Sequence, residues 1–473
     1  MHIFTSYRGR CVLAVVSGCT YALAYPPLGW GWLVVPGLIG LLVALRGQHG
    51  THARAIGFLH GLAAFGVGLS WMIQLFGVFA FSLWAVLAAF TALFAEMQSR
   101  ASLRGIGAWQ FAVFTALNWC GWEFIRAELF SLRFPWMTAG LACGPNRLLP
   151  WVGVYGVSAV VVLGAALLVA RWWKTAGTVA LGLVLTIVAN RRCPAPVAGD
   201  PDTLQVAGLQ IEESPLKVYL AATRALPEGI QHVVWPEYAV PYDIRSDAHD
   251  WPLVQQLCMD HGIILTLGTQ LHPGHEEGWH NIALTLDPTG VRGEHNKVHT
   301  VHFFNDGIAG TTALPVLTKN GMIGTPICFD CDYENIVRRM TAAGAEMFIV
   351  PSMDAKSWSV RQHNQHAALF RLRACENGRW MFVCATSGVS QVIDPHGIVH
   401  ACLPALAEGT LTGAIHRESR LTFYTRAGWL TPWVVLAIAA LCWIVLLMPQ
   451  KDFRPLGLID DRQDDTVPDL GRK

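Results

Sequence analysis

Charged residues are scarce in this chain. Only 14% of its 473 residues are Asp, Glu, Lys or Arg, and 34 basic residues almost balance 33 acidic ones. A net charge of +1 gives no reason to expect a nucleic-acid partner. Hydrophobic residues make up 53% of the chain and are concentrated in the first 190 positions and near the carboxy terminus. This composition is typical of a membrane protein with an additional soluble domain.

The chain also lacks internal repeats, extended low-complexity segments and a second Cys-x-x-Cys pair. Cys328 and Cys331 form one such motif, and His295, His299 and His302 do not complete a recognised zinc pattern with it. We therefore expect no metal and no cofactor.

Eight apolar segments predict a polytopic α-helical membrane domain. They lie near residues 11–25, 30–45, 56–75, 79–97, 107–124, 151–170, 175–190 and 428–448. A large soluble core could produce one or two such runs, but hardly seven within 190 residues. No small-residue cleavage site follows the first segment, and Pro26-Pro27 leads directly into the second, so we do not expect a cleaved signal peptide.

Basic residues occupy every second loop between these segments. The basic loops contain Arg8 and Arg10, Arg46 and Arg54, Arg100 and Arg104, and Arg171 and Lys174. Because short loops rich in Lys and Arg stay in the cytoplasm, both termini are predicted to be cytoplasmic and the large soluble domain extracytoplasmic. Arg126, Arg133, Arg191 and Arg192 run against this pattern without reversing it.

The soluble part alternates short β-branched runs with helical stretches, which predicts an α/β domain. Strands are expected at 262–268, 281–286, 346–350 and 380–385, and helices at 334–343 and 362–376. We divide the chain into a transmembrane domain (1–194), an extracytoplasmic α/β domain (195–425), a final transmembrane helix (426–450) and a charged, disordered cytoplasmic tail (451–473).

Three short segments of the soluble part carry residues suited to covalent catalysis. Cys328 follows an apolar run, where a strand would deliver its thiol to a turn. Glu237 could take and return the proton of that thiol, and Lys297 could stabilise the oxyanion formed by attack on a carbonyl. Considered alone, a single buried cysteine is more often a small hydrophobic residue than a nucleophile.

These segments resemble the Glu-Lys-Cys motifs of the nitrilase superfamily. The matching segments are Trp235-Pro236-Glu237, Asn296-Lys297, Ile327-Cys328-Phe329-Asp330 and Val350-Pro351-Ser352-Met353-Asp354-Ala355. The whole chain is similar to a membrane branch of that superfamily, the apolipoprotein N-acyltransferases. Their pattern also fits Gly57-Phe58-Leu59-His60-Gly61, Phe134-Pro135-Trp136, Gly153 to Ser158 and Thr422 to Arg426. The resemblance implies an α-β-β-α sandwich carrying a Glu237, Lys297 and Cys328 triad.

Two departures from the family pattern concern residues that could support the triad. The family usually has a second glutamate eight residues after the lysine, where this chain has Asn305 followed by Asp306. It usually has Tyr-Glu after the cysteine, where this chain has Phe329-Asp330. Asp306 could replace the glutamate through a one-residue shift. Asp330 could fix the loop or take part directly.

The resemblance implies acyl transfer from a phospholipid, through a Cys328 thioester, to the amine of a diacylglyceryl-cysteine apolipoprotein. We therefore expect a monomer in the bacterial inner membrane, with phospholipid, apolipoprotein and the bilayer as partners. Trp251, Trp279 and Trp358 are candidates for an apolar lid over the thioester, or could be core residues. His363 and His366 are most simply packing or surface residues. Two alternatives stay open: a membrane-anchored amidase or nitrilase of the same fold, and a degenerate, non-catalytic homologue.

Overall fold

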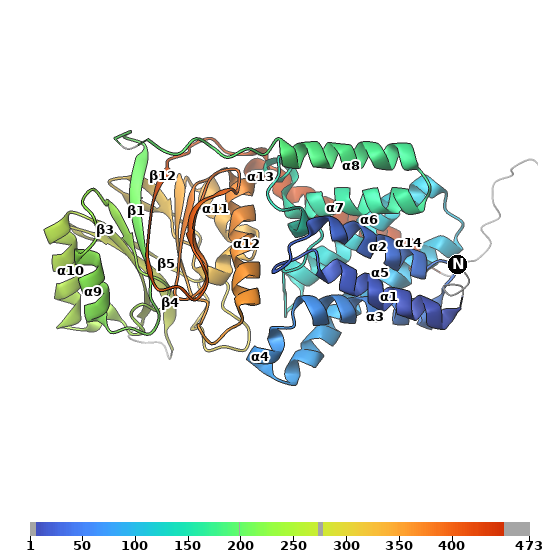
Figure 1. Ribbon diagram of the computed structural model, residues 1–473, viewed down its shortest axis with the longest axis horizontal. Helices are drawn as coiled ribbons and strands as arrows, with labels where there is room; N and C mark the ends of the chain where they lie inside the picture. Colours follow the sequence, from blue (N-terminus) through green and yellow to red (C-terminus); the bar gives the residue numbers. More distant parts are fainter. Residues whose placement is uncertain (1–5, 198, 273–277, 449–473) are drawn as a thin grey trace, which may run out of the picture.

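The computed structural model describes residues 6–197, 199–272 and 278–448. A bundle of helices and a two-sheet domain lie end to end along the long axis of the molecule (Figure 1). The predicted cytoplasmic tail, 451–473, lies outside the described residues.

The bundle is built from the apolar segments, each of which forms a helix. Its helices are α1 (Tyr7–Ala22), α2 (Val34–Ala44), α3 (Gly50–Gly68), α4 (Met72–Phe76), α5 (Phe79–Leu103), α6 (Ala108–Phe124), α7 (Leu149–Val169), α8 (Trp173–Val188) and α14 (Thr431–Leu447). The predicted continuous span 56–75 is wrong in one respect, because α3 ends at Gly68 and the short α4 is separate. Close packing requires small residues: a Cβ added at Gly57 of α3 would lie 2.4 Å from the Thr91 carbonyl oxygen of α5.

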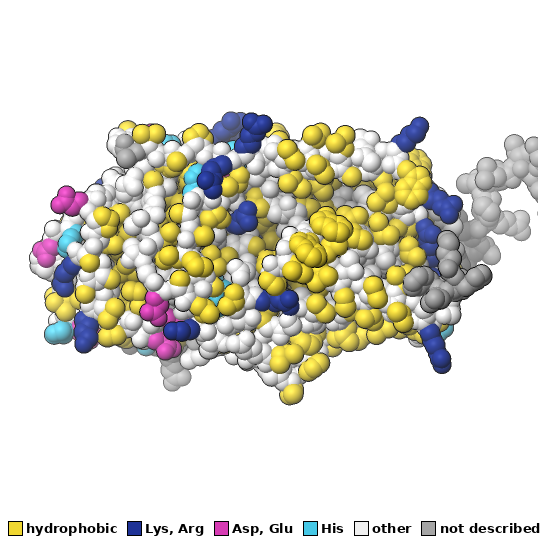
Figure 2. Space-filling view, viewed as in Figure 1, with side chains coloured by type: hydrophobic (Ala, Val, Ile, Leu, Met, Phe, Trp, Pro, Cys, Tyr) yellow, Lys and Arg dark blue, Asp and Glu magenta, His cyan; other side chains and the backbone are white. Residues whose placement is uncertain are grey.

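Large apolar side chains remain exposed on the outside of this bundle. They include Val16, Trp32, Leu181, Leu185, Leu441 and Ile444, and Figure 2 shows many hydrophobic side chains on one face of the bundle. Within the described residues, three helices are long and apolar enough to cross a membrane: Phe79–Leu103, Leu149–Val169 and Gly428–Leu447. Gly31–Ala44 and Trp173–Val188 are shorter apolar helices. An exposed apolar surface of this kind suits contact with lipid.

The soluble domain contains two six-stranded mixed sheets. The first has the order β12-β1-β2-β3-β4-β5, with β1 (Thr203–Gln210), β2 (His232–Val234), β3 (Ile264–Leu271), β4 (His280–Asp287), β5 (Gly290–Asn296) and β12 (Gly409–His416). The second has the order β11-β10-β9-β8-β7-β6, with β6 (Val316–Thr318), β7 (Gly321–Gly324), β8 (Met347–Ser352), β9 (Met381–Ala385), β10 (Ser390–Ile393) and β11 (Val399–Leu403). A buried cluster that includes Val206, Val234, Ile349 and Phe382 joins side chains from both sheets.

Helices cover the outer faces of both sheets. The first sheet carries α9 (Leu216–Arg224) and α10 (Asp250–His261), and the second carries α11 (Asn335–Ala342) and α12 (Val360–Asn377) (Figure 1). The predicted α-β-β-α sandwich is therefore confirmed, and each strand and helix expected in the soluble part overlaps an observed one. A short helix, α13 (Phe423–Arg426), leads back to the bundle.

Helix α12 faces the bundle and joins the two parts. Helix α7 is kinked at Gly153 (φ 65°), where an added Cβ would lie 2.4 Å from the Tyr424 ring. The Val154 N–H beside the kink donates to Glu376 Oε1 of α12 at 2.8 Å. Trp71 Nε1 similarly donates to Gln365 Oε1 of α12 at 2.9 Å. These buried hydrogen bonds fix the end of the bundle against the second sheet.

Candidate active site

Cys328 begins a short 3₁₀ turn, Cys328–Cys331, that follows the second sheet's strand β7. Its backbone is left-handed (φ 48°), which is unusual for a residue with a Cβ and occurs preferentially at functional sites. The side chain is only 5% exposed, and Sγ donates to the Met353 carbonyl oxygen at 3.4 Å. The turn therefore holds the thiol in one buried position.

Asp330 holds this turn in place. Its carboxylate accepts hydrogen bonds from the backbone N–H groups of Ile327, Val298 and His299 at 3.1, 3.0 and 2.8 Å. Its Oδ2 also lies 2.9 Å from His295 Nε2. Burial alone would raise the pKa of Asp330, but His295 and these donors lower it below its ordinary value. Of the two roles considered for Asp330, these contacts correspond to fixing the loop.

Glu237 and Lys297 come from the first sheet and meet in an ion pair. Glu237 lies just beyond β2 and Lys297 directly follows β5. Lys297 Nζ lies 2.7 Å from Glu237 Oε1 and 2.8 Å from Asp306 Oδ2. Glu237 and Lys297 are each 1% exposed, and Asp306 is 5% exposed. A lysine between two carboxylates is thus removed almost completely from solvent.

Two polar residues that sequence reasoning missed complete this cluster. Asn281 Nδ2 donates to Glu237 Oε1 at 2.6 Å and to Asp306 Oδ1 at 2.9 Å. The Tyr238 hydroxyl donates to Asp306 Oδ1 and accepts from Asn281 at 2.9 Å. Asn281 lies one residue into β4, and Tyr238 adjoins Glu237, but no local sequence pattern distinguishes either residue from an ordinary strand or turn position.

Burial and the neighbouring charges shift the pKa values of Glu237, Lys297 and Cys328. Burial raises the pKa of Glu237, although Lys297 opposes the shift. Burial would lower the pKa of Lys297, but Asp306 and Glu237 raise it well above its ordinary value. Burial and then Glu237 raise the pKa of the Cys328 thiol. Lys297 is therefore charged and Cys328 is a thiol at neutral pH, so the thiol needs a base such as Glu237.

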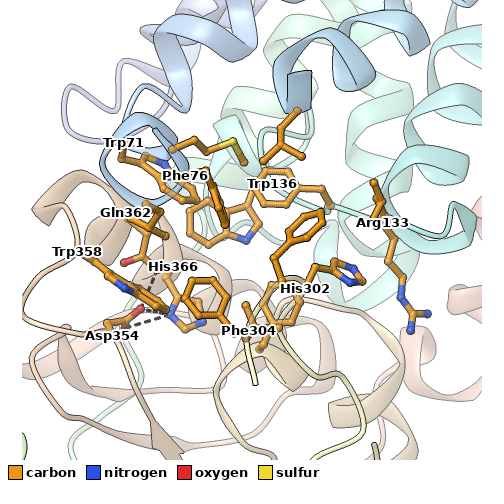
Figure 3. A pocket seen from close by; sticks show the side chains of 18 of the residues that line it. Trp71, Phe76, Arg133, Trp136, His302, Phe304, Asp354, Trp358, Gln362 and His366 are labelled. Carbon is orange, nitrogen blue, oxygen red and sulfur yellow. Dashed lines mark hydrogen bonds and ion pairs between the residues drawn. The ribbon is translucent and has the colours of Figure 1, made fainter. Parts of the chain in front are cut away.

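Cys328 lies where two cavities meet. The larger, of about 810 Å³, is lined by Glu237, Lys297, Asn305 and Asp306 among others. The smaller, of about 110 Å³, is an apolar passage toward the bundle, and Figure 3 shows Trp71, Phe76 and Trp136 along it. A molecule that reacts at Cys328 can thus place a polar part in the larger cavity and an apolar part in the passage.

Of the other residues singled out from the sequence, four line the cavities at Cys328 and Trp251 does not. Asn305 is exposed at the larger cavity, whereas Phe329 lines the apolar passage. Trp279 lines the larger cavity and Trp358 lines both. Trp251 instead packs against the core beneath α9 and α10, so it is not part of a lid.

A buried histidine, His366, lies between two carboxylates beside the Cys328 turn. His366 Nδ1 lies 2.9 Å from Asp354 Oδ1, and its Nε2 lies 3.1 Å from Asp332 Oδ1. Asp354 follows Met353, whose carbonyl oxygen accepts from Cys328, and Asp332 follows the Cys328–Cys331 turn. Trp136 Nε1 from the bundle donates to Asp332 Oδ2 at 2.5 Å. His366 is therefore not a surface residue: it is packed in the interior, and it forms two ion pairs there.

Groups that could ligate a metal lie apart from this cluster. Within the described residues, Cys193, Asp394 and His396 form one such group, and Asp200, Asp202 and His416 form another. In the first group, His396 Nδ1 lies 2.6 Å from the Arg191 carbonyl oxygen, so this nitrogen already has a hydrogen-bond partner. Neither group includes a residue of the Cys328 cavities.

Comparisons with known proteins match both parts of the chain. Residues 17–167 match the apolipoprotein N-acyltransferase N-terminal domain, and residues 187–422 match the carbon-nitrogen hydrolase family. A solved carbon-nitrogen hydrolase from Helicobacter pylori is 19% identical, with a TM-score of 0.40 over 50% of this chain and 94% of that one.

Two relatives match this chain almost from end to end. An apolipoprotein N-acyltransferase of Geobacter metallireducens is 26% identical over 92% of this chain and 94% of its own length. An apolipoprotein N-acyltransferase of Pseudomonas aeruginosa is 27% identical over 93% of this chain and 97% of its own length. The apolar helices and the N-terminal family domain identify a membrane protein. With both domains matched in order, the chain belongs to the apolipoprotein N-acyltransferase family.

Proposed function

We propose that this chain transfers an acyl chain from a phospholipid, through a thioester on Cys328, to the amino-terminal amine of a diacylglyceryl-cysteine apolipoprotein. The observation that carries the proposal is the position of Cys328, where the cavity containing Glu237 and Lys297 joins an apolar passage to the bundle. The names of the relatives support the class of acceptor. Both substrates carry fatty chains, which would be costly to expose to water.

In the first half of the reaction, Cys328 Sγ attacks the carbonyl carbon of the phospholipid ester while its proton passes to Glu237. The tetrahedral intermediate then collapses and the carbon–oxygen bond of the ester breaks. The departing alcohol oxygen takes the proton from Glu237. A lysophospholipid leaves, and the acyl chain remains on Cys328 as a thioester.

Lys297 stabilises the oxyanion of that intermediate. An ammonium has three N–H donors, and Glu237 and Asp306 accept two of them. The third is available to an oxygen that becomes negative at the reacting carbon. Because the lysine is buried and held by two carboxylates, little reorganisation accompanies the development of this charge.

In the second half, the amine of the acceptor attacks the thioester carbon and loses a proton to Glu237. The carbon–sulfur bond breaks, the sulfur recovers a proton from Glu237, and an amide is formed. Water must be kept away during the lifetime of the thioester. Phe304 and Trp358 line both cavities with their rings 5.5 Å apart, and we assign them, with Trp279, to an apolar lid.

The proposed orientation places the soluble domain outside the cytoplasm of a bacterial cell. The basic loops lie at the bundle end opposite that domain (Figure 2). Contacts there include Arg10 Nη1 to the Ala44 carbonyl oxygen at 3.1 Å, Arg46 Nη2 to that of Val169 at 2.6 Å, and Arg100 Nε to Glu96 Oε1 at 2.7 Å. Positive charge at one end supports a cytoplasmic location for that end.

We retain the proposed division into residues 1–194, 195–425, 426–450 and 451–473. The working unit is proposed to be a monomer, because Glu237, Lys297 and Cys328 all come from one chain.

The test is the fate of a labelled acyl chain. The purified full chain is incubated with phospholipid carrying a radioactive acyl group and with a synthetic diacylglyceryl-cysteine peptide. Transfer predicts label on the peptide as an amide that resists hydroxylamine, and no transfer by Cys328→Ala. Release of the label as free fatty acid would identify a hydrolase instead. No movement of label would favour a non-catalytic homologue.

A further inference from the structure

We propose that Arg133, assisted by His302, binds the phosphate of the donor phospholipid beside the passage to Cys328. The inference rests on the proposed function, since it assigns a headgroup contact to the same donor. Both residues line the apolar passage, as Cys328 does. Figure 3 shows them on one side of that passage, with Trp71 and Trp358 on the other.

The guanidinium of Arg133 has no protein counter-charge within the part of the chain that the structure describes. Among the described residues it forms no ion pair with a carboxylate, and its polar side-chain neighbour is the uncharged Tyr333 hydroxyl. It lies instead over the Tyr333 ring, with Cζ 5.0 Å from the ring centroid. A half-buried cation beside an apolar cavity is costly to leave unpaired. A guanidinium carries about five N–H donors in one plane, so donors remain for the two oxygens of a phosphodiester beside the Tyr333 contact.

The backbone at Arg133 is fixed relative to the nucleophile. The Tyr333 hydroxyl donates to the Arg133 carbonyl oxygen at 3.1 Å. Three residues later in the same loop, Trp136 donates to Asp332. Both partners, Tyr333 and Asp332, closely follow the Cys328 turn. A phosphate on this guanidinium would therefore be held at a defined position relative to the thiol.

The other cations near Cys328 are already compensated. Glu237 and Asp306 flank Lys297, and Asp354 and Asp332 flank His366. Among the described residues that line the passage, Arg133 is therefore the cation that can bind an anionic group without breaking an existing ion pair.

His302 can add an uncharged hydrogen bond. Its Nε2 is buried and has no partner among the described atoms. Burial and then Arg133 lower the pKa of His302, so the imidazole is neutral at pH 7 and does not repel the guanidinium.

This arrangement matches the form of a glycerophospholipid. The ester and the phosphate are attached to one glycerol, and the acyl chain and headgroup diverge from it. With the ester carbonyl at Cys328, the acyl chain of the donor would lie along the apolar side chains of Trp71, Phe76 and Leu83. The phosphate would lie toward Arg133.

The test compares donors with and without a phosphate. Initial rates of thioester formation on the full chain are measured by intact-protein mass spectrometry, with dipalmitoyl phosphatidylethanolamine or dipalmitoylglycerol as donor. Arg133→Gln should lower the rate with the phospholipid about ten- to one-hundred-fold, as expected for the loss of a charge-assisted hydrogen bond. The rate with dipalmitoylglycerol should not change. Arg133→Lys should be intermediate with the phospholipid, because an ammonium keeps the charge but not the planar geometry.

Arg147→Gln is the matched control, since Arg147 contacts His396 and the Ala189 carbonyl and does not line the passage. An equal loss with both donors, or no loss with either, would overturn the inference and leave Arg133 with at most a structural role. Phospholipid binding to Cys328→Ala, with and without Arg133→Gln, is measured by native mass spectrometry. If the wild-type chain forms no thioester with either donor, the proposed function fails. The inference then stands if Arg133→Gln weakens phospholipid binding and falls if it does not.

Discussion

Asp306 Oδ2 lies 2.8 Å from Lys297 Nζ, almost as close as Glu237 Oε1 at 2.7 Å. Burial alone would raise the pKa of Asp306, but the Lys297 ammonium lowers it below its ordinary value. The lysine is consequently held between two carboxylates. The neighbouring Asn305 is exposed at the cavity and makes no comparable contact among the described residues.

This relationship predicts that Asp306, and not Asn305, supports the oxyanion-stabilising lysine. Asp306→Ala should lower the rate of thioester formation by about a hundred-fold, the scale seen when electrostatic support of an oxyanion is lost. Asn305→Ala should have a mild effect. Both rates are measured by intact-protein mass spectrometry with phospholipid. Near-normal acylation by Asp306→Ala would refute the role, and faster acylation by Asn305→Glu would then indicate a loss of family machinery in this chain.

The apolar passage predicts a dependence on acyl-chain length. Val86 of α5 lines the passage, and a larger side chain there should obstruct a long chain more than a short one. Val86→Trp should therefore slow thioester formation from a sixteen-carbon donor at least about ten-fold more than from an eight-carbon donor. Leu93→Trp, on an exposed part of the same helix, is the control and should not alter the ratio. An unchanged ratio in Val86→Trp would place the acyl chain elsewhere.

The buried His366 predicts a pH-dependent stability. Burial would lower its pKa, but Asp354 and Asp332 raise it to about 10, above the ordinary value of about 6.5. Because its pKa is higher in the folded than in the unfolded state, protonated His366 stabilises the folded protein. This stabilisation is fully present below about pH 6.5 and is lost as the pH rises through about 10. The difference in melting temperature between wild type and His366→Gln should therefore shrink from pH 7 to pH 10. The exposed His261→Gln should show a small difference throughout, whereas a gap for His366→Gln that widens with pH would contradict the ion pairs.

The distribution of basic loops predicts the orientation in the membrane. A reporter fused after Lys174 or Lys451 should read cytoplasmic, and one fused near Asp287 should read extracytoplasmic. Lys451 lies outside the described residues, so its fusion tests the sequence pattern alone. A cytoplasmic signal at Asp287 would overturn both the topology and the proposed lipoprotein acceptor.

Sequence reasoning could single out the three candidate catalytic residues because each lies in a short segment with a family-specific pattern. Glu237 follows β2, Lys297 follows β5, and Cys328 begins the turn after β7. The sandwich was predictable for a related reason, since alternating β-branched and helical runs report which faces are buried.

The ion pairs of His366 beside the Cys328 turn could not be predicted in the same way. Asp332, Asp354 and His366 lie on different elements, and only the packing of α12 against the Cys328 turn brings them together. Their spacing along the chain resembles no local motif. Trp251 was open to either of two interpretations, lid or core, and it packs from α10 against the core of the first sheet.

The most direct test of the central claim is the mass of the intact protein after incubation with phospholipid. The account predicts an added acyl group that hydroxylamine removes, that is absent from Cys328→Ala and that forms at least about a hundred-fold more slowly in Glu237→Gln, which lacks the base. An adduct that persists in Cys328→Ala would contradict the assignment of Cys328 as the acyl carrier.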